Sequence, residues 1–119
     1  MSNPDGIVIH VTSGESEDWQ TALRNLRNLA QDNSVSTPPE LIRVVVNGPA
    51  VRFLLAGAPE ASRIARMVEA GVQIRACSNS LERFGYATDE VVEGVETVQS
   101  GVAQAVRLQQ RGSAYLKLP

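Results

Sequence analysis

Short apolar runs alternate along the chain with polar stretches that contain serine, asparagine, glycine or proline. Five of these runs have the length of strands, and they predict strands over 7–11, 41–46, 72–77, 95–98 and 114–118. The segment beginning at Ser16 differs, because its apolar residues recur at the spacing of one helix face. This face comprises Trp19, Ala22, Leu23, Leu26 and Leu29.

Capping residues and glycines mark the ends of further helices between the later strands. We expect these helices over 50–56, 59–71, 79–85 and 100–112. A polar loop over 33–39 precedes the second strand, Pro49 suits a helix start, and Asn79 with Glu82 fits a capping arrangement. Strands alternating with helices predict an α/β fold with a parallel sheet covered by helices on both faces.

The composition is that of one globular domain spanning residues 1–119. The hydrophobic fraction is 43%, and only five residues are aromatic, so the core must consist mostly of Val, Leu, Ile and Ala. Charge is nearly balanced, with 11 basic and 13 acidic residues and no basic stripe, which argues against a nucleic-acid partner. The longest apolar runs are too short to cross a membrane.

Compartment and disulfide chemistry follow from the start of the sequence and its single cysteine. The first residues lack the basic and apolar regions of a secretion signal. One cysteine cannot form an internal disulfide bond. We therefore expect a cytoplasmic protein in a reducing environment.

Polar residues follow four of the predicted strands. In a parallel α/β sheet these strand ends meet along one edge, where helix N-termini point free N–H groups at ligands. Such residues also occur simply as helix caps, and both interpretations stay open for each one. The candidate ligand-binding residues at this edge are Ser13, Gly14, Asn47, Gly48, Ser78, Asn79 and Ser100.

Cys77 is the candidate catalytic residue, at the end of the third strand and before a helix. A lone cysteine is most often a small buried hydrophobe, but a helix N-terminus stabilises a thiolate. Arg75, a further candidate binding residue, shares the strand face of Cys77, and that face is polar while the other is apolar. A nucleophilic or sulfur-carrying thiol is therefore the sharper hypothesis.

Other chemistries have weaker support in the sequence. Cys77 and Arg83 have the spacing of a cysteine-dependent phosphatase loop, but the residues between them include no glycine and do include Glu82. His10 lies within a predicted strand, where we expect a core histidine bonded to backbone. The histidine, cysteine and carboxylates show no metal-ligand spacing, and no cofactor motif is present, so we expect neither a metal nor a cofactor.

Four stretches of the chain, in their order and spacing, are similar to the DsrE/DsrF-like family of small sulfur-relay proteins with the YchN-like fold. They are VNGPAV at 46–51, GV at 71–72 continuing to ACSNSL at 76–81, VQSGV at 98–102 and LQQRGSAYL at 108–116. The resemblance implies a three-layer α/β/α sandwich with a five-stranded parallel sheet. It also implies homo- or hetero-oligomers, commonly trimers or hexamers.

In better understood family members, a cysteine after a strand accepts sulfur as a persulfide and passes it to a partner. The resemblance assigns that role to Cys77, and it places Asn47 where many relatives carry the histidine of a His-Gly-Pro pattern. The leading hypothesis is a sulfur carrier or sulfurtransferase-type homo-oligomer with external sulfur donor and acceptor proteins. The alternative is a non-catalytic small-ligand-binding or assembly module of the same fold.

Overall fold

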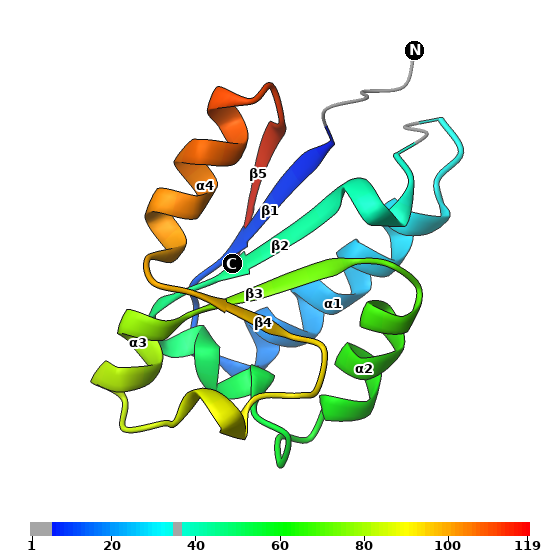
Figure 1. The fold of residues 1–119 in the computed structure, drawn as a ribbon. Coiled ribbons are helices and arrows are strands. Elements are labelled where there is room, and N and C mark those ends of the chain that lie inside the picture. Colours follow the sequence, from blue (N-terminus) through cyan, green and yellow to red (C-terminus); the bar gives the residue numbers. More distant parts are fainter. Residues whose placement is uncertain (1–5, 35–36) are drawn as a thin grey trace.

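The computed structural model describes residues 6–34 and 37–119, and its centre is one five-stranded sheet (Figure 1). All strand pairs are parallel, and the spatial order is β4-β3-β2-β1-β5. The strands are β1 (Ile7–Val11), β2 (Ile42–Val46), β3 (Gln73–Cys77), β4 (Glu96–Val98) and β5 (Ala114–Leu118). The predicted parallel α/β sheet is thus confirmed.

Helices cover both faces of this sheet and complete three layers. In Figure 1, α1 and α2 lie on one face, and α4 lies on the other. The α-helices are α1 (Ser16–Gln31), α2 (Ala61–Glu69), α3 (Ser78–Arg83) and α4 (Gly101–Gln110). Three short 3-10 helices connect them, namely η1 (Pro39–Leu41), η2 (Gly48–Leu54) and η3 (Thr88–Glu90).

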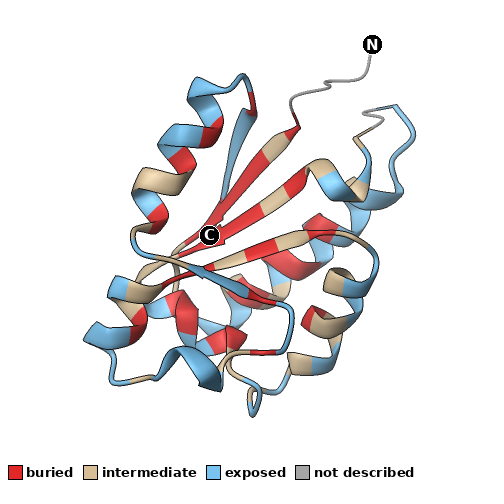
Figure 2. Ribbon diagram, viewed as in Figure 1, coloured by how far each residue is buried: buried red, intermediate tan, exposed pale blue. Residues whose placement is uncertain are grey.

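The two sheet faces are covered unequally. On the side of α1 and α2, strand residues such as Ile9 and Val44 belong to the larger core, in which Trp19 stacks on Phe53 with ring centroids 5.1 Å apart. On the side of α4, the buried cluster is much smaller and comprises Val8, Val45, Ala105 and Leu108. Figure 2 shows buried strands in the sheet centre and an exposed β5 at its edge. The α4 face therefore has room for polar side chains.

Local differences from the sequence expectations have physical causes. The expected helix over 50–56 is the 3-10 helix η2, which begins at Gly48 because Pro49 occupies its first turn. The predicted cap at Asn79 is wrong, since α3 follows β3 directly and has Cys77 at its N-cap. Ser100 does cap α4, with its Oγ accepting a bond from the Ala103 N–H at 3.1 Å. The expected loop over 33–39 includes residues 35–36, which lie outside the described ones.

Candidate functional site

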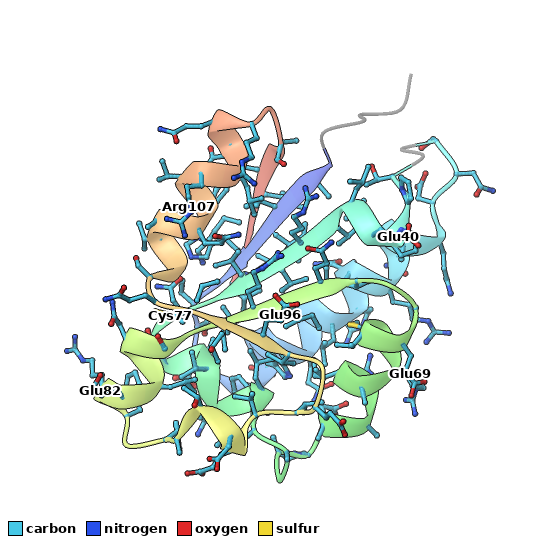
Figure 3. The ribbon with its side chains drawn as sticks, in the orientation of Figure 1. Glu40, Glu69, Cys77, Glu82, Glu96 and Arg107 are labelled. Carbon is cyan, nitrogen blue, oxygen red and sulfur yellow. The ribbon has the colours of Figure 1, made fainter. Side chains whose placement is uncertain are left out.

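Cys77 lies where β3 meets α3, beside the first residue of α4 (Figure 3). The residue is 5% exposed, and its thiol donates a hydrogen bond to the Gln99 carbonyl at 3.6 Å. A Cβ on Gly101 would lie 3.3 Å from Cys77 Cβ and 3.0 Å from Asn47 Cβ. The absence of a side chain at Gly101 thus lets α4 begin directly against Cys77 and Asn47.

The surroundings of Cys77 favour its thiolate. Burial raises the pKa of the thiol, since it disfavours charge. A hydrogen bond from the Ser80 side chain and backbone N–H bonds from Gly101, Ser80 and Asn79 lower it, and together they prevail, so the pKa of Cys77 is below its usual value. The negative charge that these groups stabilise is the property a nucleophilic cysteine needs.

Ser80 is held in place from the neighbouring strand end. The Gly48 N–H donates a hydrogen bond to Ser80 Oγ at 2.8 Å. Gly48 has a φ of +67°, a left-handed conformation that favours glycine, so this residue type helps to aim its N–H at Ser80. Sequence reasoning missed Ser80, although its place three residues after Cys77, in the first turn of α3, could have identified it.

A second group of side chains reaches the site through Asn47. His10 Nε2 bonds to Asn47 Oδ1, and His10 Nδ1 bonds to the Tyr115 hydroxyl at 2.6 Å. Because Oδ1 of the amide accepts, His10 carries its proton on Nε2 and accepts from Tyr115 on Nδ1. The expected backbone partner of His10 is therefore wrong, since both ring nitrogens bond to side chains. The chain of bonds fixes the carboxamide of Asn47, whose Cβ, like that of Cys77, lies close to Gly101.

The remaining predicted binding residues differ in how close they lie to the thiol. Ser78 and Asn79 form the first turn of α3, and the Asn79 N–H also bonds the Gln99 carbonyl at 3.1 Å. Ser13 and Gly14 follow β1 and have other partners. The Ser13 hydroxyl donates to Asp18 at 2.5 Å, and the Gly14 carbonyl accepts from Arg52 at 2.6 Å.

Arg75 shares the face of Cys77, but its guanidinium has other partners. Its Nη2 donates to Gln73 Oε1 at 2.8 Å, and its Nε lies 3.9 Å from the Glu96 carboxylate. Gln73 precedes Arg75 on β3, so this bond turns the guanidinium toward the amino end of the strand. The groups that lower the pKa of Cys77 are Ser80, Gly101 and Asn79, rather than Arg75.

A family model and several solved structures match this chain. The model of the DsrE/DsrF-like family matches residues 6–118. The chain belongs to the DsrE/DsrF-like family. The match confirms the resemblance found in the sequence. Members of this family generally serve in sulfur relay. A search of curated proteins gave no match.

The structural neighbours of this DsrE/DsrF-like chain agree with the assignment. MTH1491, a protein of unknown function from Methanobacterium thermoautotrophicum, is 30% identical with a TM-score of 0.84, and the match covers 93% of this chain and 96% of that one. The ychN protein from E. coli is 16% identical with a TM-score of 0.72, covering 94% and 98%. BT1422 from Bacteroides thetaiotaomicron, also of unknown function, is 22% identical with a TM-score of 0.71, covering 98% and 97%. The latter two matches show the shared fold.

Two further observations concern metals and membranes. Among residues 6–34 and 37–119, no group of three or more His, Cys, Asp or Glu side chains could hold a metal ion. In the same described part of the chain, no helix is long and apolar enough to cross a membrane.

Proposed function

We propose that this DsrE/DsrF-like protein accepts sulfane sulfur on Cys77 as a persulfide and passes it to a partner protein. The observation that carries the proposal is the lowered pKa of Cys77, produced by the Ser80 hydroxyl and backbone N–H groups around a buried sulfur. A larger thiolate fraction near neutral pH speeds attack on a sulfur electrophile. Membership of a family that generally serves in sulfur relay gives independent support.

The chemistry consists of two balanced displacements. Cys77 first loses its proton to solvent, and its thiolate attacks the outer sulfur of a donor persulfide. A new bond forms between this sulfur and Cys77 Sγ, the donor S–S bond breaks, and its electron pair leaves with the donor thiolate. A partner thiolate then attacks the same outer sulfur and releases the Cys77 thiolate, so neither step needs an external oxidant or reductant.

The neighbouring strand ends have defined roles in this proposal. Ser80 and the N–H groups of Asn79 and Gly101 stabilise negative charge on the sulfur, while Gly48 positions Ser80. The site is bordered by Asn47, Ser78 and Ser100. Ser13 and Gly14, which follow β1, extend the same edge of the sheet as further binding residues. The low exposure of Cys77 restricts the approach of a donor to the small accessible part of this residue.

The proposal requires external partners, because the chain has a single cysteine and cannot release the sulfur through an internal disulfide. We assign donor and acceptor roles to other proteins of a reducing cytoplasm. We also propose a homo-oligomer, a trimer or hexamer. Support comes from exposed apolar side chains on α4 and β5, namely Val102, Val106, Tyr115 and Leu116. Light scattering of the purified chain tests this, and a monomer at micromolar concentration would contradict it.

Mass spectrometry after incubation with a small persulfide donor tests the transfer role. We expect the wild-type chain to gain one sulfur atom and to lose it on addition of a thiol. Cys77→Ser is the control and should gain none. Absence of the adduct on wild type, under conditions that load an established persulfide carrier, would contradict the proposal.

One observation favours the alternative of a non-catalytic ligand-binding or assembly module. Cys77 is 5% exposed and its thiol bonds the Gln99 carbonyl, which is also how a purely structural cysteine packs. The same experiment separates the two functions, since a structural cysteine acquires no sulfur. The pH dependence of alkylation adds a second criterion, because a buried structural thiol would show an ordinary or raised pKa.

A further inference from the structure

A small hollow lined by three arginines lies on the α4 face of the sheet. Arg43 of β2, Arg75 of β3 and Arg111 at the end of α4 line a cavity of about 270 Å³. The amides of Gln73 and Gln104 contribute polar groups to its lining, and Leu41 and Leu108 contribute apolar ones. Three cations thus converge in a protein whose net charge is −2.

The electrostatics of Arg75 show that these cations act on one another. Burial lowers the pKa of Arg75, the Glu96 carboxylate raises it, and the nearby positive charge of Arg43 lowers it, leaving the pKa below the ordinary arginine value. Glu96 compensates weakly, because its side chain is 75% exposed and lies 3.9 Å from Arg75 Nε. Among the described residues, the lining of the hollow thus includes three arginines and no carboxylate, and Arg75 is partly desolvated there.

One guanidinium nitrogen of Arg75 also lacks a hydrogen-bond acceptor. Arg75 Nη2 donates to Gln73, but the buried Nη1 has no partner among the described residues. A buried donor without an acceptor is unfavourable and uncommon in native proteins. Arg75 itself lines the hollow, so an acceptor bound there lies beside this guanidinium.

We propose that this hollow, the arginine pocket, binds a small tetrahedral oxyanion of the size of phosphate or sulfate. Guanidinium groups donate paired hydrogen bonds to the oxygens of such anions, and several arginines spread this binding over more than one oxygen. Gln104 assists, because its Oε1 accepts a bond from Arg107 and its amide N–H₂ is left to donate. A volume of about 270 Å³ lies below the range of drug-sized ligand sites and suits a small anion with its water.

The arginine pocket is separate from Cys77. Cys77 does not line the pocket, and Arg75, two residues before it on β3, donates to Gln73 and so has its guanidinium turned toward the amino end of the strand. The pocket lies beneath the end of α4, while Cys77 lies at its beginning. The bound anion is thus a second ligand, and its binding does not depend on sulfur transfer.

Calorimetric titration of the full chain with inorganic phosphate, at constant ionic strength set by chloride, tests the pocket. We expect saturable binding and a rise in Tm that added chloride does not reproduce. Arg75→Gln and Arg111→Gln should each weaken binding by about tenfold or more, because each removes charged hydrogen bonds. Arg24→Gln, an equal charge change at an exposed position on α1, should bind as wild type.

Two further variants should change phosphate binding in the opposite direction or leave it unchanged. Glu96→Gln should bind phosphate more tightly, because it removes the carboxylate that competes for Arg75. Cys77→Ser should bind normally, which distinguishes failure of this inference from failure of the sulfur-transfer proposal. The inference is overturned if chloride gives the same stabilisation, if Arg24→Gln weakens binding as much as Arg111→Gln, or if both pocket variants bind normally. A nucleoside monophosphate that binds more tightly than phosphate would overturn the assignment to a small anion.

Discussion

Ser80 Oγ accepts a hydrogen bond from the Gly48 N–H at 2.8 Å, which leaves the Ser80 hydroxyl proton free to be donated to the sulfur of Cys77. The end of β2 thereby orients a hydroxyl on α3 toward a thiol at the end of β3. The acidity of Cys77 thus depends on contacts between strand ends, in addition to the short helix that follows it.

Ser80→Ala should raise the pKa of the Cys77 thiol. The substitution removes a hydrogen-bond donor that stabilises the thiolate, so the neutral thiol becomes relatively more favourable. The rate of alkylation by iodoacetamide as a function of pH measures the shift. Ser78→Ala is the matched control in the same helical turn and should leave the profile in place. Coincident profiles for Ser80→Ala and wild type would contradict the role of Ser80.

The lowered pKa of Cys77 also predicts how stability depends on pH. An acid whose pKa is lower in the folded state stabilises the fold above its unfolded pKa, and this contribution is lost as pH falls through the folded pKa. The unfolded thiol titrates near pH ~8.5. The free energy of unfolding of wild type relative to Cys77→Ser should therefore be larger at high pH than at low pH. Urea denaturation on either side of this window measures it, and a difference that shrinks as pH rises would contradict the assignment.

Gly101→Ala should destabilise the fold by about 1–3 kcal/mol, the usual cost of overpacking. Its new Cβ would press on Cys77 Cβ and Asn47 Cβ and push the start of α4 away from the sheet. Gly57→Ala provides the control, because nothing lies within 4 Å of the added methyl group there. Urea unfolding of both variants makes the comparison. Equal stabilities would show that α4 does not begin in close contact with Asn47 and Cys77.

Tyr115→Phe should cost about 0.5–1.5 kcal/mol of stability, because it leaves His10 Nδ1 without its donor. The loss of stability should lie toward the lower end of this range, because Tyr115 is 43% exposed and water can replace its hydroxyl as the donor to His10. Tyr86→Phe is a suitable control, as its hydroxyl makes no hydrogen bond to the described residues. Thermal unfolding of the two variants compares their stabilities. An equal loss of stability in Tyr86→Phe and Tyr115→Phe would contradict a stabilising role for the hydrogen bonds that join Tyr115, His10 and Asn47.

The local pattern of the sequence was sufficient to predict the strands and their order of alternation with helices. The central strands β1 and β2 are rich in β-branched residues, and the turns contain residues that stop regular structure. Prediction was weaker where two local signals compete. Pro49 marks a helix start, but the residues after it form a 3-10 helix.

The position of Cys77 at the end of β3 also followed from the sequence, whereas its partners did not. His10 and Tyr115 are 105 residues apart, and their contact depends on the neighbouring positions of β1 and β5 in the sheet. The alternation of β3 placed Arg75 on the correct face, but it did not give the direction of the guanidinium along the strand. That direction depends on Gln73 and Glu96, and Glu96 comes from a different strand.

The stacked pair of Trp19 and Phe53 has a practical consequence for all of these measurements. Trp19 is the only tryptophan, is 2% exposed, and lies in the core on the sheet face opposite α4. Its intrinsic fluorescence therefore monitors exposure of the larger core during unfolding. Substitutions and ligands on the α4 side change the environment of this fluorophore only if they disturb the fold itself, so one native signal serves every variant without an added label.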